Sequence, residues 1–424
     1  MNGYEKQLEF LSWEYGMFFH FGIRPFYPGH KDWDNKDMPP EKFAPEELDC
    51  EQWIRVAKEA GAKYAILTTK HHDGFALWPS KYSNYSVAQT PWKNGKGDVV
   101  REFVDACRKY GLKVGLYYSP AQWGKYSIPF SNAKEYDDYF INQLGELLTQ
   151  YGKIDYLWFD GCGSEGHEYD KARIVKAIGD MQPDILTFCD PEWTPGVRWI
   201  GNEDGYASLS NPLVVSSTDF SELATEEQKL SSAVFLPAEC DCKLRSTWFW
   251  DLNEETIKST EELFGMYEMS VGHGSNFLIN IGPDSRGLLP DADVERILEL
   301  GKQIKESYGA PKSFSVPVKA GDIYTVTNLE ADMPDWLTAP KSERISNCVV
   351  IEEDLANGQS VESFSIYAYL PAYKHKKILV FEGKTIGHKV ICKFSAIRAS
   401  KYEIVINSHN GDYAINDIKV FYVK

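Results

Sequence analysis

The stretch Lys63-Tyr-Ala-Ile-Leu-Thr-Thr-Lys-His-His-Asp-Gly-Phe-Ala-Leu-Trp78 joins an apolar run to a polar end. Residues 64–67 are apolar and compatible with β-structure, which predicts a buried strand. Residues 68–73 are polar and include two adjacent histidines and an aspartate, which are costly to bury without partners. A strand that is apolar along its length and polar at its C-terminal end is typical of a parallel barrel that presents side chains to a substrate there.

The same alternation of apolar strand, amphipathic helix and glycine continues on both sides of this stretch. The other expected strands are residues 17–23, 113–119, 154–160, 185–189, 233–239 and 276–282. The expected helices are residues 50–60, 98–110, 133–151, 168–180, 254–270 and 291–307. This pattern predicts an α/β fold with a parallel sheet, a (β/α)8-like TIM barrel. Between residues 192 and 229, Pro, Gly, Ser and Trp dominate, which predicts long loops near the active site.

After residue 312 the pattern changes to short alternating segments separated by turn residues. These segments include residues 349–351, 363–367, 377–381 and 403–407. Short strands without helices between them predict a β-sandwich. The sequence therefore predicts two domains, a catalytic barrel over residues 1–312 and a C-terminal β-sandwich over residues 313–424.

Composition narrows the class of protein and of partner. The net charge of −17 argues against binding to nucleic acid or to an anionic membrane surface. The eight cysteines form no CxxC pair, and no run of 18 apolar residues occurs. We therefore expect free thiols and an intracellular, cytoplasmic protein, unless a leader was removed. The aromatic content of 14% suits a packed core or a pocket for a sugar ring, and the oligomeric state stays open.

Polar residues at the predicted strand ends support two kinds of chemistry. The first is metal-assisted hydrolysis, with four ligands: His20, His71, His72 and Asp160. Adjacent histidines on a strand point to opposite faces, and no HxH or HExxH spacing is present. We therefore expect no metal and no cofactor, and this first kind of chemistry remains the alternative.

The second kind is glycoside hydrolysis by paired carboxylates, one of which acts on the anomeric carbon while the other exchanges a proton. Asp160 suits the first role, because it is a lone acid at the end of the apolar segment Tyr156-Leu-Trp-Phe. Such an acid is costly to desolvate unless something uses it. A structural acid that caps a loop is the alternative for Asp160.

Several segments resemble the signature segments of the α-L-fucosidases of glycoside hydrolase family 29. In chain order they are Met17-Phe-Phe-His-Phe-Gly, the stretch from Lys63 to Phe75, Gly115-Leu-Tyr-Tyr-Ser, Trp158-Phe-Asp-Gly and Asn280-Ile-Gly-Pro-Asp-Ser-Arg-Gly287. The C-terminal sandwich also resembles that family's module. The resemblance implies a retaining exo-α-L-fucosidase that releases L-fucose from fucosylated oligosaccharides by double displacement, with Asp160 as the nucleophile.

Three shorter motifs resemble the subgroup that prefers α-1,3/4-linked fucose on Lewis-type glycans. They are Gly201-Asn-Glu203, Pro237-Ala-Glu-Cys-Asp241 and Ile351-Glu-Glu-Asp354. The first motif implies Glu203 as the general acid/base, in preference to Glu239. Glu239 would then position Arg245 or the sugar.

The resemblance also implies a set of residues that contact the sugar. The residues expected to hold the fucose ring and its hydroxyls are His20, Trp33, His71, His72 and Tyr118. Trp248 and Phe249 are candidates for the apolar patch under the methyl group, and Arg198 for a hydroxyl contact or a pair with a surface acid. Asp32 stands where many family members have Glu. A barrel with this site but without catalysis would be a fucose-binding lectin, the non-enzyme alternative.

Overall fold

The computed structural model describes residues 3–29, 36–126, 132–161, 166–188, 196–219, 227–252, 256–329, 345–370 and 376–424. Eight parallel strands close into a barrel in the order β1-β10-β9-β6-β5-β4-β3-β2. Their bounds are β1 (Tyr15–Phe19), β2 (Tyr64–Lys70), β3 (Lys113–Tyr118), β4 (Tyr156–Phe159), β5 (Leu186–Phe188), β6 (Gly196–Trp199), β9 (Ala238–Lys243) and β10 (Asn276–Asn280). The predicted α/β barrel is confirmed.

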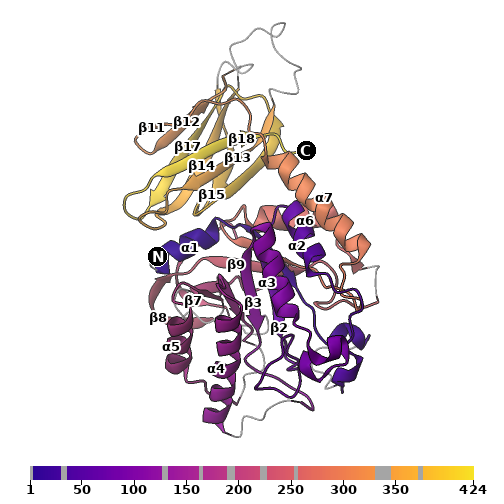
Figure 1. Ribbon diagram of the computed structural model, residues 1–424. Helices are drawn as coiled ribbons and strands as arrows, with labels where there is room; N and C mark the ends of the chain where they lie inside the picture. The colour runs from indigo at the N-terminus through magenta and orange to yellow at the C-terminus, as the bar shows by residue number, and fades with distance from the viewer. Residues whose placement is uncertain are drawn as a thin grey trace.

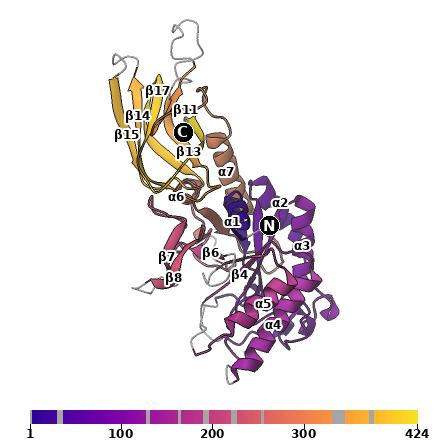
Figure 2. The same ribbon diagram turned by 90° about the vertical axis from the view of Figure 1, so that its left-hand side faces the viewer.

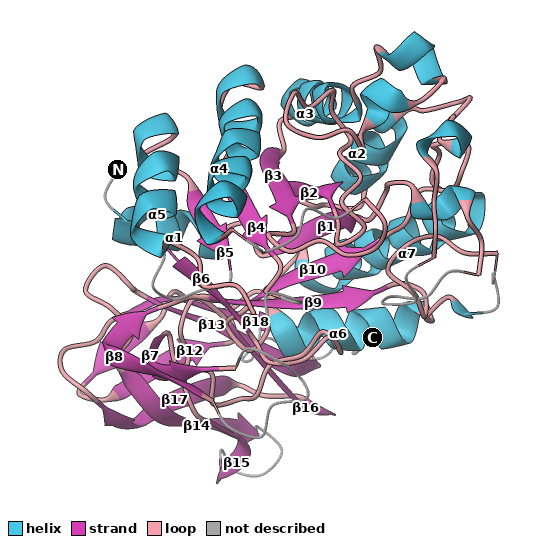
Figure 3. Cartoon of the chain, turned by 90° about the horizontal axis from the view of Figure 1, so that it is seen from below, coloured by secondary structure: helices cyan, strands magenta, loops and turns pink. Residues whose placement is uncertain are grey.

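Helices follow most of the barrel strands and lie outside the barrel (Figures 1 and 3). They are α2 (Cys50–Glu59), α3 (Val99–Tyr110), α4 (Ala133–Gln150), α5 (Lys171–Met181), α6 (Thr260–Ser270) and α7 (Asp291–Tyr308). Short 3-10 helices in the loops are η1 (Arg24–Phe26), η2 (Pro40–Lys42), η3 (Val87–Gln89) and η4 (Trp92–Gly95). Asp49 and Asp98 cap α2 and α3 by accepting a backbone N–H bond, which explains why these helices begin where they do.

The structure corrects the prediction between residues 192 and 243. A loop was expected at β6 and at the hairpin of β7 (Val214–Thr218) and β8 (Gln228–Phe235), which projects beside the barrel (Figure 2). The predicted strand 233–239 spans the end of β8 and the beginning of β9. Pro237 lies between them and has no N–H to donate. Glu239 is therefore the second residue of β9 rather than the end of a strand.

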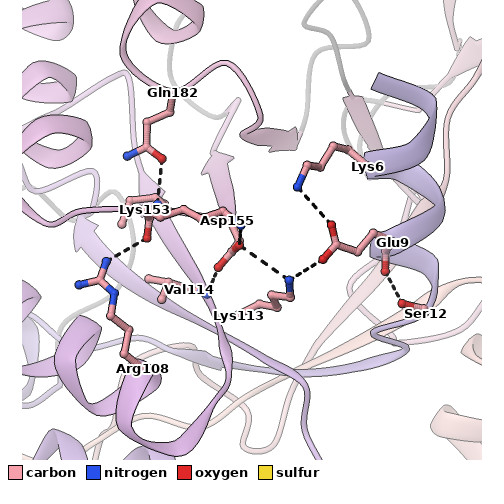
Figure 4. A network of polar contacts seen from close by, with 10 residues as sticks. Lys6, Glu9, Ser12, Arg108, Lys113, Val114, Lys153, Asp155 and Gln182 are labelled. Atoms are coloured by element: carbon pink, nitrogen blue, oxygen red, sulfur yellow. Dashed lines mark hydrogen bonds and ion pairs between the residues drawn. The ribbon is translucent and has the colours of Figure 1, made fainter. Parts of the chain in front are cut away.

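An N-terminal helix that the sequence did not predict, α1 (Gly3–Leu11), closes the N-terminal end of the barrel. Phe10 and Trp13 enter the same buried cluster as the inward-facing side chains of the strands. Figure 4 shows the polar contacts around this helix: Lys113 Nζ pairs with Glu9 and lies 4.0 Å from Asp155. Apolar packing thus closes the N-terminal end of the barrel. The charged contacts among Glu9, Lys113 and Asp155 form an ionic rim around this packing.

The C-terminal part forms two antiparallel sheets that enclose their own core. One sheet contains β11 (Val318–Ala320), β12 (Ile323–Thr327), β17 (Lys401–His409), β14 (Val361–Leu370) and β15 (Lys376–Gly383). The other contains β16 (Val390–Ile397), β13 (Ser346–Glu353) and β18 (Ile415–Phe421). This is the sandwich expected from the alternating pattern.

The sandwich packs against the barrel near the N-terminal ends of its strands. Ile391 and Phe421 of the smaller sheet belong to the same buried cluster as residues of α6 and β10. The backbone N–H of Ile391 donates to Gly272 O over 2.9 Å. Glu14, immediately before β1, pairs with Lys389 of the sandwich. The C-terminal ends of the strands therefore face away from this contact.

The apolar runs and the cysteines of the sequence can also be compared with the described residues. Among them, no helix is both long enough and apolar enough to cross a membrane. The six described cysteines are free and buried, in line with the predicted thiols. The other two, Cys162 and Cys189, lie outside the described residues.

Candidate active site

The C-terminal ends of three barrel strands bring together the predicted histidines and carboxylate. His20 follows β1, and Asp160 follows β4. His71 and His72 follow β2. The ring centroids of His20 and His71 are 5.6 Å apart, and those of His71 and His72 are 4.2 Å apart. These four residues form one site.

Tyr117 and His72 are among the neighbours that hold Asp160. Its Oδ2 accepts a hydrogen bond from the Tyr117 hydroxyl over 2.8 Å and lies 3.2 Å from His72 Nε2. The Asp160 side chain keeps 23% of its surface exposed, so a ligand can approach it. A fixed and partly exposed carboxylate at this position can act as a nucleophile or as a metal ligand.

His20 is oriented by Asn280. Asn280 Nδ2 donates to Trp248 O over 2.6 Å, which leaves its Oδ1 to accept from His20 Nδ1 over 2.7 Å. Burial lowers the pKa of His20 to about 3, so the ring is neutral at ordinary pH. With the proton on Nδ1, the other ring nitrogen is an acceptor suited to a sugar hydroxyl.

Part of the site also has the composition of a metal site. One ligand atom from each of His71, His72 and Asp160 lies within 4.8 Å of the others. This group could hold a metal ion and matches three of the four ligands considered from the sequence. His72 Nδ1 is 2.7 Å from the Ser119 hydroxyl, which would orient the ring for either role.

The structure corrects the choice between two adjacent tyrosines. Tyr118 was expected to contact the sugar, but it is fully buried and donates to Gln143 of α4 over 2.6 Å. Lys70 lies on the same side, 4.3 Å from the Tyr118 ring, and burial lowers the pKa of Lys70 to about 7. Tyr117 faces the barrel interior, because successive side chains on a strand point to opposite faces. Tyr117, which donates to Asp160, therefore belongs to the site at the strand ends, and Tyr118 does not.

Two aromatic rings, those of Trp248 and Phe249, stand beside the histidines. The Trp248 ring stacks on His20 with centroids 4.8 Å apart. Phe249 meets His20 and His71 edge-on at 5.4 Å and 5.0 Å. These rings supply an apolar wall next to polar groups, the combination that a sugar face requires.

Glu203 lies on the loop after β6 and contacts the end of β9. Lys243 Nζ donates to Glu203 Oε2 over 2.5 Å and lies 4.9 Å from the centre of the Trp248 ring. Glu203 is thereby connected to the histidines through Lys243 and Trp248. Below this pair, Asp241 accepts a bond from Trp199 Nε1 over 2.8 Å. Burial raises the pKa of Asp241 well above its usual range, and the nearby charge of Glu203 adds to the shift.

Glu239 lies at the opposite end of the barrel. It is fully buried and accepts from Tyr64 over 2.6 Å, Tyr156 over 3.1 Å and Trp158 Nε1 over 2.9 Å. Tyr64 and Tyr156 begin β2 and β4, so this cluster belongs to the N-terminal layer of the interior. Glu239 therefore lies away from His20, His71, His72 and Asp160, which corrects the position predicted for it at the strand ends. Arg245, its predicted partner, pairs with Asp293.

Arg198 and Trp33 complete the predicted set. Arg198 points out of the barrel, since its neighbours Val197 and Trp199 face inward, and it donates to Asn211 Oδ1 over 2.5 Å. Among the described residues, Arg198 contacts none of the site residues at the strand ends, so the structure lends no support to the predicted hydroxyl contact, and its partner is an amide rather than a surface acid. Trp33, with Asp32, lies outside the described residues.

The sequence did not single out some residues that the structure adds to the site. They are Tyr117, Trp199, Asp241, Lys243 and Asn280. Every second residue of β9, namely Glu239, Asp241 and Lys243, points to the same inward face of the strand. This pattern can be recognised only once the bounds of β9 are known. Asn280 begins a family-like segment and could have been found from it.

The fold and this site define a class. A closed eight-stranded barrel that gathers histidines, aromatic rings and carboxylates at the C-terminal ends of its strands has the architecture of a barrel enzyme with its active site at that end. The family model described as alpha-L-fucosidase matches residues 6–308. The chain therefore belongs to the α-L-fucosidase family, glycoside hydrolase family 29, as its motifs predicted.

Individual relatives agree with this assignment along nearly the whole chain. Alpha-L-fucosidase 1 of Arabidopsis thaliana is 31% identical over 97% of this chain and 86% of its own length. A glycoside hydrolase 29 family member from a rumen bacterium is 29% identical, with a TM-score of 0.83, over 99% of this chain and 77% of that one. A Ruminococcus gnavus GH29 fucosidase in complex with fucose is 26% identical, with a TM-score of 0.81, over 99% and 94% of the two chains.

Proposed function

We propose that this enzyme is a retaining exo-α-L-fucosidase in which Asp160 is the nucleophile and Glu203 the general acid/base. The substrate class is a fucosylated oligosaccharide, as the fucose complex of the Ruminococcus gnavus relative supports. The observation that carries the proposal is Asp160, held by Tyr117 and facing His72 among aromatic rings at the strand ends.

The reaction proceeds in two displacements. In the first, an Asp160 oxygen bonds to the anomeric carbon while the bond to the leaving oxygen breaks, and Glu203 gives that oxygen its proton. In the second, water loses a proton to Glu203 and attacks the same carbon, which releases Asp160 and fucose with its original configuration. Neutral His20 accepts from a sugar hydroxyl, and Trp248 and Phe249 pack on the apolar side of the ring.

A substitution of Glu203 tests its role. An aryl fucoside with a good leaving group departs without protonation, whereas a natural oligosaccharide needs the acid. We expect Glu203→Ala to abolish cleavage of oligosaccharides and to retain an initial burst on the aryl substrate. Added azide should speed turnover and give α-fucosyl azide. If Glu239→Ala showed this dependence on the leaving group instead, the acid/base would have been assigned to the wrong residue.

The linkage preference is proposed from the three subgroup motifs around Glu203, Asp241 and Asp354. We expect faster release of fucose from Lewis-type trisaccharides, which carry α-1,3 or α-1,4 links, than from 2′-fucosyllactose. Product analysis on both substrates under the same conditions tests this preference. Faster cleavage of 2′-fucosyllactose would contradict it.

The group of His71, His72 and Asp160 gives the metal-dependent alternative a specific basis. The fucosidase mechanism predicts full activity on an aryl fucoside after prolonged chelation and dialysis. Activity that is lost and then restored by one divalent ion would favour the metal-dependent reaction. Fucose binding without any cleavage of the aryl fucoside would identify a lectin.

A further inference from the structure

Lys243 ends β9 and has no role in the two displacements described above. We infer that Lys243 is a positioning residue that sets when Glu203 carries a proton and when it acts as a base. This inference rests on the proposed role of Glu203 and adds to it the group that controls its ionisation.

The contacts of Lys243 place a positive charge directly against the proposed acid/base. Its Nζ is 2.5 Å from Glu203 Oε2, and both side chains are partly exposed, at 24% and 34%. The same ammonium group lies 4.9 Å from the centre of the Trp248 ring, whose π-face attracts cations. Lys243 thus joins the loop of Glu203 to the aromatic wall of the sugar site.

The main chain of Lys243 is fixed by the barrel sheet. Lys243 pairs with Asn280 in the barrel sheet, and its carbonyl accepts from Lys258 Nζ over 2.8 Å. Glu203 lies on the loop after β6, where the next residue, Asp204, forms a β-bridge with Cys242 of β9. The barrel therefore determines where the ammonium group stands, and contact with that group holds the Glu203 carboxylate at the end of β9.

Carboxylates in the described surroundings of Glu203 act in the opposite direction. Asp241 on β9 interacts with Glu203 through its charge, Asp204 follows Glu203 in the loop, and Asp219 lies beside Gly201 at the start of that loop. Carboxylates near Glu203 favour its protonated form, whereas an ammonium group in contact favours the ionised form. Lys243 therefore opposes these acids and stabilises Glu203 as a carboxylate.

The two half-reactions need opposite forms of Glu203. Proton donation to the leaving oxygen needs the acid, and activation of water needs the carboxylate. By favouring the carboxylate, Lys243 lowers the pH above which the first step fails. It also lowers the pH at which the second step becomes possible. Removal of the charge should move both limits upward together.

The test compares pH profiles of Lys243→Met with those of the wild type. We expect the alkaline limb of kcat/KM on a Lewis-type trisaccharide to move up by about one pH unit. The acid limb of kcat on an aryl fucoside, where hydrolysis of the glycosyl-enzyme limits turnover, should move up by a similar amount. Lys243→Arg keeps the charge and should restore both limbs.

A structural role for Lys243 predicts a different result. Rates would then fall at every pH without movement of either limb, and this outcome would overturn the inference. Lys258→Met is the matched control, because it removes the bond to the Lys243 carbonyl and keeps both charges of the Lys243–Glu203 pair, so neither limb should move. If Lys243→Met does not fold, Lys243→Gln is measured in its place with the same expectations.

Failure of the inference can be told apart from failure of the proposed function. Glu203→Ala is measured in parallel on the aryl and the natural substrates. If it shows the expected dependence on the leaving group while the limbs of Lys243→Met stay in place, only the inference about Lys243 is overturned. If Glu203→Ala lacks that dependence, the role of Glu203 fails and the inference fails with it.

Discussion

The two ends of the barrel hold a carboxylate under opposite conditions. At the C-terminal end, Asp160 keeps part of its surface exposed and contacts Tyr117 and His72. At the N-terminal end, Glu239 is fully buried and receives hydrogen bonds from Tyr64, Tyr156 and Trp158. Two acids that both follow apolar residues in the sequence thus have different surroundings.

The difference shows that access decides which acid can do chemistry. Phe10 and Trp13 pack on the tyrosines around Glu239 and screen the carboxyl group from solvent on that side. Trp158 connects the two ends, since its Nε1 donates to Glu239 and its ring stacks on Tyr117 at 5.4 Å. Trp158 thereby links the buried cluster around Glu239 at the N-terminal, closed end to Tyr117, which contacts Asp160 at the C-terminal, open end.

The largest expected effect comes from the open end. Asp160→Ala should reduce turnover by about three orders of magnitude or more, on the order of 4 kcal/mol of barrier, because the covalent intermediate can no longer form. Added azide should restore turnover and give the inverted β-fucosyl azide in one displacement. Steady-state kinetics and product analysis check both points. Hydrolysis near the wild-type rate would contradict the assignment of Asp160.

The two adjacent tyrosines at the end of β3 give a matched pair. Tyr117→Phe removes the hydrogen bond to Asp160 and should lower kcat/KM roughly 10- to 100-fold, with little change in stability. Tyr118→Phe removes the bond to Gln143 and should cost about 1–3 kcal/mol of unfolding free energy with activity retained. Kinetics and urea unfolding of both variants check this contrast. Equal loss of activity in both would break the assignment of faces.

At the closed end the expected effect is on stability and depends on pH. Burial raises the pKa of Glu239 from 4.5 to about 7, even though its three hydrogen bonds lower it. A pKa that is higher in the folded state stabilises the fold below about pH 4.5, and this contribution is lost as the pH rises to about 7.

The size of this contribution is about 3 kcal/mol, since each pKa unit corresponds to about 1.4 kcal/mol. Glu239→Gln does not titrate, so the difference in unfolding free energy between wild type and variant should change by that amount from pH 4.5 to pH 7.5. Urea unfolding at several pH values measures it. A difference that stays constant with pH would contradict the raised pKa.

The smallest effect is expected at the ionic rim around α1. Lys113 is about one-third exposed and pairs with Glu9 at the closed end. Exposed pairs of this kind contribute about 1 kcal/mol or less. Lys113→Met should therefore lower the unfolding free energy by no more than that, less in high salt, and leave kinetics unchanged. A loss of activity would show that the closed end controls the site through α1.

The sequence by itself determined the barrel, the sandwich and most of the open end. Apolar segments that end in polar residues predicted His20, His71, His72 and Asp160 at one edge, because parallel strands place their C-terminal ends together. Motifs along the chain predicted the family. These features are local, since each depends on residues within one strand and the loop that follows it.

Only the tertiary structure decided which face a residue presents and which end of a strand it occupies. Strands buried on both sides carry apolar or aromatic residues at every position, so the sequence could not choose between Tyr117 and Tyr118. Polar residues around the short β6 concealed a strand, and the displaced start of β9 moved Glu239 to the closed end. The contact of Lys243 with Glu203 joins segments far apart in the chain, and closure of the barrel alone brings them together.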